Sequence, residues 1–184
     1  MKAIKILIIG KNSFLANNYK NNTKIKNLTL IDRSSIDSIN LEKYTHIINF
    51  SLDPKVKKKD YNLTYKLDKK ICYLIKNKNI IYVLPSSRAV YSEINKIPYK
   101  ENCIKKYPNG FYGKNKLKIE KEVKKIINKN YLIIRIPTLL IFDVSKRNLF
   151  ISRILFNLKK LGKKNFDIKS DTFKDFITIE YFSF

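Results

Sequence analysis

The stretch AIKILIIGKNSFLA at residues 3–16 decides the fold of this chain. Its first seven residues are almost continuously apolar, which is typical of a parallel strand buried on both faces. Gly10 follows at once, and a short helix pattern then runs to about Tyr19. A strand, a glycine turn and a helix N-terminus in this order form the phosphate cradle of dinucleotide-binding folds. Gly10, Ser13 and Ala16 hold the positions where that turn needs small residues, so the stretch predicts a nucleotide-binding turn with a single glycine.

The alternation of strands and helices continues along the chain. Apolar runs of strand length recur, and helix patterns with apolar stripes lie between them. The predicted strands are residues 28–31, 46–50, 80–87 and 131–136, and the predicted helices are Asn62 to about Lys76 and a longer one after Gly110. This rhythm predicts an α/β fold, a Rossmann-like doubly wound parallel sheet with helices on both faces. His46 lies only 14 residues after Asp32, so we expect an abbreviated connection between the second and third strands.

Length and composition limit the kinds of protein that this chain can be. With 184 residues, of which 44% are hydrophobic, it can form one domain with a real core. Cys72 and Cys103 are far apart and have no neighbours at metal-site spacing, so we expect no disulfide framework, no bound metal and a reducing compartment. The longest apolar run, residues 131–144, contains Arg135 and Pro137 and is too short to span a bilayer. These features predict a cytoplasmic protein without a membrane span.

The net charge of +24 raises the question of a nucleic-acid partner. Arginine, which reads base edges and binds phosphates in a bidentate manner, supplies only five of the 39 basic residues. The lysines are spread along the whole chain among asparagine and isoleucine. We therefore interpret the charge as a solvated basic surface. A nucleic-acid-binding domain stays an alternative that the charge alone favours.

A second informative stretch is IIYVLPSSRAVY at residues 80–91. Its apolar run predicts a strand that ends in hydroxyl residues. Ligands of open α/β sheets bind outside the carboxyl ends of the strands, so Ser87 would face that crevice. Tyr112 follows 25 residues later on the next helix, and Lys116 lies one turn further along on its inward face. A buried ammonium is costly without partners, so a lysine at this position indicates a functional site.

The spacing of this tyrosine and lysine is not informative by itself. With 12 tyrosines and this many lysines, a tyrosine followed four residues later by a lysine should occur about twice by chance, and it does, at Tyr65 and at Tyr112. No serine-tipped strand precedes Tyr65. The strand before Tyr112 therefore decides between the two pairs, and we predict that Ser87, Tyr112 and Lys116 form one site.

Asp32 and Arg33 close the second predicted strand, about 20 residues after the glycine turn. An acid there suits the ribose hydroxyls of NAD, whereas an arginine suits the 2′-phosphate of NADP. A polar turn with a solvated ion pair would also place these two residues side by side. The sequence leaves the choice between the two dinucleotides, and the structural alternative, open.

Together these motifs resemble the extended short-chain dehydrogenase/reductase family, the NAD(P)-dependent epimerases and dehydratases that mostly act on nucleotide-activated sugars. The matching segments are the glycine turn at Gly10, HIINFS, Asn62 on the following helix, VLPSSRAVY, FYGKNKLKIEKEV and LIIRIP. The resemblance covers about residues 1–140, and KDFITIEY from Lys174 is a weaker echo of the segment that leads into the substrate domain of that family. It implies an NAD(P)-binding Rossmann domain over residues 1–145. Residues 146–184 would then be the start of a truncated substrate-binding region.

The resemblance also implies roles for particular residues. Ser87 matches the catalytic serine or threonine, Tyr112 the catalytic tyrosine and Lys116 the catalytic lysine. In that chemistry the lysine ammonium and the positive nicotinamide lower the pKa of the tyrosine, which exchanges a proton with a sugar hydroxyl while hydride moves at nicotinamide C4. The cofactor-binding residues expected from the motifs and the resemblance, besides Tyr112 and Lys116, are Gly10, Ser13, Phe14, Leu15, Asp32, Arg33, Ser51, Asn62 and Pro137.

The function that the resemblance implies is an NAD(P)-dependent nucleotide-sugar epimerase or keto-reductase in surface polysaccharide biosynthesis, assembled as a homodimer. Sugar dehydratases of the family carry Asp-Glu directly after the catalytic hydroxyl, where this chain has Arg88 and Ala89, so a 4,6-dehydratase is disfavoured. The substrate region is short in this sequence. An inactive remnant that binds a cofactor or a partner is therefore the alternative within the family.

Overall fold

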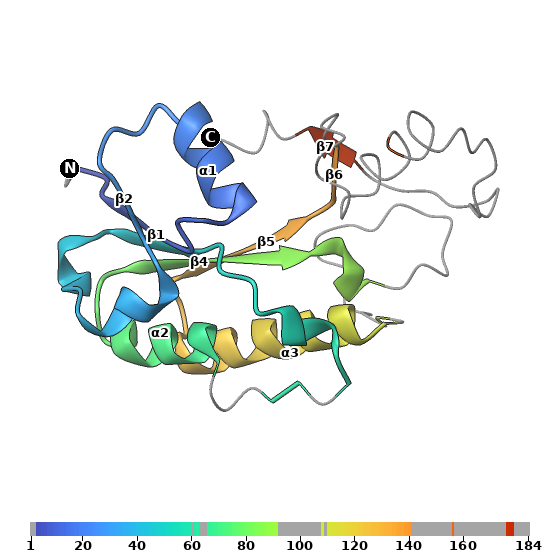
Figure 1. The fold of residues 1–184 in the computed structure, drawn as a ribbon. Helices are drawn as coiled ribbons and strands as arrows, with labels where there is room; N and C mark the ends of the chain where they lie inside the picture. Colours follow the sequence, from blue (N-terminus) through green and yellow to red (C-terminus); the bar gives the residue numbers. More distant parts are fainter. Residues whose placement is uncertain are drawn as a thin grey trace.

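A parallel sheet forms the centre of the protein, as predicted (Figure 1). The structure, a computed structural model, describes residues 3–59, 61–62, 66–91, 108, 110–140, 156 and 176–178. Its five-stranded sheet has the order β2-β1-β3-β4-β5, and every neighbouring pair is parallel. The strands are β1 (Ile6–Ile9), β2 (Leu28–Ile31), β3 (His46–Asn49), β4 (Ile81–Ser87) and β5 (Tyr131–Ile136).

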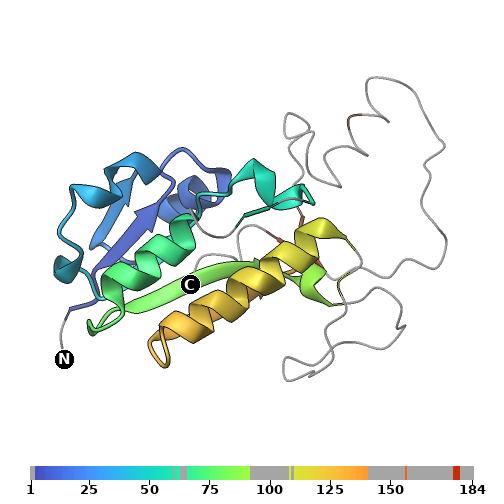
Figure 2. The same cartoon turned by 90° about the horizontal axis from the view of Figure 1, so that it is seen from below.

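Helices cover both faces of this sheet. Helix α1 (Phe14–Asn22) lies on one face, and α2 (Leu67–Ile75) and α3 (Phe111–Ile126) lie side by side on the other (Figures 1 and 2). Each face has its own apolar cluster, one between α1 and the sheet and a larger one beneath α2 and α3. Strand residues alternate between the two clusters, since successive side chains point to opposite faces. The doubly wound α/β prediction is confirmed.

Two connections differ in length from ordinary βαβ units. Only short 3₁₀ turns, Arg33–Asp37 and Leu41–Lys43, join β2 to β3, which confirms the expected abbreviation. The helix predicted from Asn62 is wrong at its start, because α2 begins at Leu67. Lys66 precedes it with extended backbone, and its ammonium binds the carboxylate of Asp53 at 2.7 Å. This ion pair holds Lys66 towards the preceding segment, so the helix begins after it.

A small second sheet follows Pro137. Strands β6 (Thr138–Leu140) and β7 (Phe176–Thr178) pair in parallel, so a segment late in the chain returns beside the end of the main sheet (Figure 1). The predicted domain boundary near residue 145 lies outside the described residues. In the part of the chain that the structure describes, no helix is long and apolar enough to cross a bilayer.

Candidate active site

The crevice at the carboxyl edge of the sheet arises from unequal strand lengths. β3 pairs with β4 only as far as Val83, whereas β4 and β5 stay paired up to Ser87 and Ile136. The last residues of β4 therefore have an open edge beside the end of β3. Pro85 lies on that edge, where its missing N–H removes no hydrogen bond to β3. Its carbonyl oxygen is available to a side chain and accepts a hydrogen bond from Lys116 Nζ at 2.8 Å.

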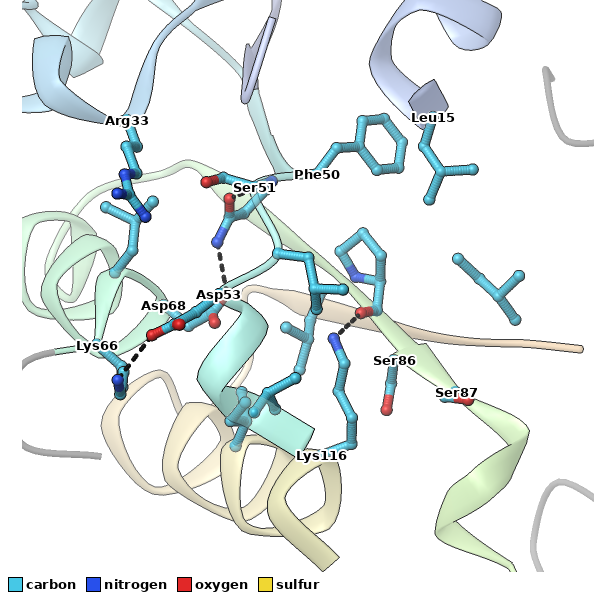
Figure 3. A pocket seen from close by; sticks show the side chains of 18 of the residues that line it. Leu15, Arg33, Phe50, Ser51, Asp53, Lys66, Asp68, Ser86, Ser87 and Lys116 are labelled. Carbon is cyan, nitrogen blue, oxygen red and sulfur yellow. Dashed lines mark hydrogen bonds and ion pairs between the residues drawn. The ribbon is translucent and has the colours of Figure 1, made fainter. Parts of the chain in front are cut away.

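A cavity of about 600 Å³ lies along this edge (Figure 3). It runs from Arg33 after β2, past Ser51 after β3, to Ser87 at the end of β4 and Pro137 after β5. The side of the cavity that faces α3 is formed by Tyr112, Lys116 and Ile119. Its volume lies within the usual range of ligand pockets, and its position is where α/β sheets bind nucleotides.

The structure brings the three predicted catalytic residues, Ser87, Tyr112 and Lys116, to this cavity. The Ser87 hydroxyl oxygen accepts a hydrogen bond from the Ala89 backbone N–H at 3.2 Å, which fixes its position at the strand end. Burial raises the pKa of Tyr112, and a hydrogen bond with Ser87 opposes that rise only in part. The sequence argument expected a lowered pKa in the presence of a nicotinamide. Burial is the larger of the two effects in this structure, so the phenol keeps its proton at neutral pH.

Lys116 is buried, with 8% of its surface exposed. Its ammonium points to the backbone of β4 rather than to solvent (Figure 3). Burial lowers the pKa of Lys116, and the negative charges of Asp68 and Glu120 oppose that change. Asn115 on the same helix donates to the carbonyl oxygens of Val56 and Lys58 at 2.9 and 2.8 Å. These bonds tie α3 to the segment after β3, which forms the opposite wall of the cavity.

Gly113 sets the distance between Tyr112 and the strand end. A Cβ at this position would lie 1.9 Å from the carbonyl oxygen of Ala89, in the 3₁₀ turn Arg88–Val90 that follows Ser87. No side chain fits between the first turn of α3 and that 3₁₀ turn. The glycine therefore allows the approach that joins Ser87 to Tyr112.

Replacing Gly113 by alanine is expected to lower the free energy of unfolding by about 1–3 kcal/mol, the usual cost of inserting a methyl group into a filled space. Urea unfolding followed by circular dichroism measures this loss. Gly110→Ala is the matched control, because a Cβ at Gly110 meets nothing within 4 Å. It should cost about 0.5 kcal/mol, since glycine is a somewhat better N-cap than alanine. Equal losses in the two variants would contradict the close-approach argument.

The predicted nucleotide turn is formed, but most of its residues lie outside the cavity lining. Gly10 has φ +95°, and a Cβ there would lie 2.8 Å from the Ser51 backbone nitrogen, so only glycine fits. The Ser13 hydroxyl caps α1 by accepting from Ala16 N at 3.1 Å, and its own N–H donates to the Gly10 carbonyl at 2.8 Å. Leu15 and Ser51 line the cavity, whereas Gly10, Ser13 and Phe14 do not.

The structure separates the two neighbours at the end of β2. The Asp32 carboxylate is bound by Lys11 Nζ at 2.8 Å and by Asn12 Nδ2 at 3.4 Å, and it does not line the cavity. Arg33 is exposed and lines it (Figure 3). Asn62 is exposed and lies outside the cavity lining. Pro137 lies at the opposite end of the cavity, after β5.

A buried polar network that the sequence analysis missed lies behind the site. The Glu120 carboxylate, 2% exposed, accepts from Ser86 Oγ at 2.6 Å and from Arg135 Nε and Nη2 at 3.1 and 2.8 Å. Arg135 Nη1 donates to the Tyr91 hydroxyl at 2.6 Å. The network joins α3, β4 and β5 next to Ser87. The sequence signal was the arginine inside the apolar run YLIIRI, which requires a buried acid as partner.

A second missed group lies on the floor of the cavity. The Asp68 carboxylate, in the first turn of α2, accepts at Oδ1 from Asn49 Nδ2 at 2.9 Å and from the hydroxyl of fully buried Tyr82. Asn49 Oδ1 in turn accepts from the Ser51 backbone N–H at 3.0 Å. Burial and the charge of Asp68 raise the pKa of Tyr82 well above its usual value, so Tyr82 acts as a hydrogen-bond donor. The sequence gives no signal for Asp68, because a polar residue near the start of a helix is ordinary.

One family model and many solved structures match this chain. The family model described as RmlD substrate binding domain matches residues 4–173. A dTDP-4-dehydrorhamnose reductase from Clostridium acetobutylicum is 28% identical, with a TM-score of 0.66 over 86% of this chain and 60% of that one. A UDP-N-acetylglucosamine 4-epimerase from Methanobrevibacter ruminantium is 19% identical, with a TM-score of 0.71 over 98% of this chain and 70% of that one.

A third solved structure, a dTDP-4-dehydrorhamnose reductase from Bacillus anthracis in complex with NADP, is 20% identical, with a TM-score of 0.62. The match covers 76% of this chain and 55% of that reductase. No curated protein matches the chain by sequence. The chain spans about 60% of the length of the reductase from Clostridium acetobutylicum.

Proposed function

The chain belongs to the RmlD substrate-binding-domain family, and we propose that it is an NAD(P)H-dependent reductase of a nucleotide-linked 4-keto sugar. Membership of this family confirms the relationship to the extended short-chain dehydrogenase/reductases. The observation that carries the proposal is the convergence of Ser87, Tyr112 and Lys116 on one cavity at the carboxyl edge of the sheet. A reductase is favoured over an epimerase because the matching family model is that of the RmlD substrate binding domain, and a 28% identical solved structure is a dTDP-4-dehydrorhamnose reductase.

The cavity suits a dinucleotide that lies along the ends of the strands. Arg33, Ser51 and Asp53 offer polar groups at the adenosine end, and Pro137 and Leu139 offer an apolar surface at the nicotinamide end. Gly10 brings the first turn close to Ser51, which lines the cavity. A bound NAD(P)H would supply the hydride.

The protein's own residues would handle the proton and the carbonyl. Tyr112 would donate its hydroxyl proton to the carbonyl oxygen of the sugar, while the Ser87 hydroxyl holds the same oxygen. Lys116 would stabilise the tyrosinate that results and bind a ribose hydroxyl. Arg88 and Ala89 offer no acid or base for removing water, so the proposal does not extend to dehydration.

The direct test is incubation of the purified chain with dTDP-4-dehydrorhamnose, the substrate named for the reductases that it resembles, and with NADPH or NADH. Loss of the reduced-nicotinamide absorbance together with the alcohol product would support the proposal. Cofactor binding by calorimetry without turnover would favour the inactive, cofactor-binding alternative. No binding of any of the four nicotinamide dinucleotides at millimolar concentration would contradict both.

Arg33 leads us to propose NADP(H) rather than NAD(H) as the cofactor. The other basic groups of this end of the cavity are engaged, Lys66 with Asp53 at 2.7 Å and Lys70 with Asp37 at 2.6 Å. Arg33 forms no ion pair within the described residues. Asp32, which would repel a phosphate, is held by Lys11. An arginine with free donors beside a paired acid suits a 2′-phosphate.

Arg33→Ala is therefore expected to weaken NADPH binding about tenfold, because one charge-assisted hydrogen bond is lost. NADH binding to the same variant should stay within about twofold, since NADH has no phosphate at that position. Fluorescence titration of both cofactors measures the difference. Lys43→Ala, in the 3₁₀ turn Leu41–Lys43, removes an equal charge outside the cavity lining and is the control. A parallel loss of NADH and NADPH affinity in Arg33→Ala would contradict the assignment.

A further inference from the structure

The ammonium of Lys116 has an incomplete set of partners. It is buried, and its hydrogen bond goes to the neutral carbonyl of Pro85 at 2.8 Å. Within the described ranges no carboxylate lies within ion-pair distance of it. A buried ammonium loses its hydration and tends to lose its proton unless a negative charge lies nearby.

Glu120 lies one helical turn after Lys116, but its charge is already compensated. Both of its oxygens bind Arg135, in a bidentate pair with distances of 3.1 and 2.8 Å, and Ser86 donates a further hydrogen bond. The pair carries no net charge, so it attracts a second cation only weakly. Arg135 itself lies on β5, behind the acid.

Asp68 is the opposite case. The described carboxylates that form ion pairs with lysine or arginine are Asp32, Asp37, Glu42, Asp53, Glu120 and Glu122. Asp68, alone among the carboxylates in the described part of the chain, has no cation within that distance, and only the neutral donors Asn49 and Tyr82 bind it. It lines the same cavity as Lys116, from α2 rather than α3 (Figure 3).

We propose that Asp68 is the counter-ion of Lys116: an uncompensated carboxylate and an uncompensated ammonium share one cavity, and the carboxylate keeps the ammonium charged. Asp68 is thus a positioning residue that acts through Lys116, and the catalytic meaning of this pair rests on the proposed reductase function. The direction of the Lys116 pKa agrees, because Asp68 is the larger of the two charges that oppose the lowering by burial.

The other groups around Lys116 do not replace this charge. From α3, Tyr112 keeps its proton because burial raises its pKa, and Glu120 is bound to Arg135 of β5. From β3 and β4 come Asn49 and Ser86, which are neutral, and Tyr82, whose pKa is raised. From the segment after β3 comes Asp53, which is paired with Lys66.

Competitive labelling of lysine amines with acetic anhydride, resolved by peptide mass spectrometry, tests the proposal without cofactor or turnover. Only the neutral amine reacts, so the labelling rate against pH reports the charge of Lys116, and the plateau at high pH corrects for access. In Asp68→Asn, Lys116 should label about threefold faster than in the parent protein at mildly alkaline pH, relative to that plateau. Asp68→Glu, which restores the charge, should return the rate to that of the parent.

Glu122→Gln is the matched control, because it removes one negative charge from α3 at a half-buried pair with Lys69 at 3.7 Å. An unchanged Lys116 profile in Asp68→Asn, or an equal change in Glu122→Gln, would overturn the proposal. Circular dichroism verifies the fold, and Asp68→Ser, smaller and also uncharged, takes the place of Asp68→Asn if that variant does not fold. Absence of reductase activity in the parent protein would contradict the proposed function, but it would not affect the labelling test of the Asp68–Lys116 pair.

Discussion

Tyr112→Phe is expected to lower the rate of NADPH-dependent sugar reduction by about 10²–10⁴-fold, the usual contribution of a positioned general acid. The substitution removes only the hydroxyl, so the ring should still fill its place against the apolar cluster beneath α3. NADPH affinity should change by no more than about twofold, because the substitution leaves Arg33 and Ser51, which would bind the adenosine end, unchanged. Stopped-flow measurement of NADPH oxidation under single-turnover conditions separates the chemical step from binding.

The matched control for Tyr112→Phe is Tyr73→Phe, which removes a phenol hydroxyl from α2 at a residue that is 58% exposed. It should leave the rate unchanged. The pH dependence of the reduction rate in the parent protein tests the direction of the Tyr112 pKa shift. Burial raises the pKa of Tyr112, so the reduction rate should be level around neutral pH and fall as alkaline pH removes the phenol proton. A Tyr112→Phe protein that keeps more than about one tenth of the parent rate would exclude the phenol as the acid.

Much of the fold could be predicted because the buried strands are recognisable in the sequence as apolar runs. β1 is buried throughout and consists of isoleucine and leucine, and β3 has two buried isoleucines between His46 and Asn49. A strand buried on both faces leaves a continuous apolar run that is visible without any alignment. Gly10 was informative for a similar reason, since its backbone conformation excludes other residues.

The meeting of Ser87, Tyr112 and Lys116 could be anticipated because each of them breaks a local rule. A lysine on the inward face of an amphipathic helix and hydroxyls at a strand tip are unfavourable unless they have partners. Asp68 and Glu120 broke no such rule in sequence, since acids on a lysine-rich helix are ordinary. Their partners, Tyr82 and Arg135, come from other strands, and pairing across that distance is not encoded locally.

The start of α2 was predicted too early for a related reason. The apolar spacing of the helix extends back to Leu63, so the pattern alone sets no N-terminal limit. In the structure the helix begins at Leu67, and the residue before it, Lys66, is extended and bound to Asp53, 13 residues earlier in the chain. A contact across a loop decided the boundary, and Asn62 consequently lies before the helix rather than on it.

Glu120→Gln is expected to lower the free energy of unfolding by about 3–5 kcal/mol, the cost of breaking a buried ion pair by removing one partner. The glutamine would leave Arg135, whose side chain is 16% exposed, without a counter-charge, and would turn an amide donor towards its guanidinium. Arginine stays protonated in proteins even without a counter-charge, so Arg135 cannot relieve the loss by giving up its proton. Urea unfolding followed by circular dichroism measures the change.

The chain supplies a close control for Glu120→Gln two residues further along the same helix. Glu122→Gln breaks a solvent-accessible, half-buried pair with Lys69 at the long distance of 3.7 Å, and such surface pairs contribute about 0–1 kcal/mol. Replacing both members of the buried pair, Glu120→Leu with Arg135→Leu, should recover part of the lost stability, because no charge is left without a partner. Ser86 would still lose its acceptor, so the double variant should be more stable than Glu120→Gln yet less stable than the parent protein. Equal stability of Glu120→Gln and Glu122→Gln would show that the network does not hold α3 against the end of β4.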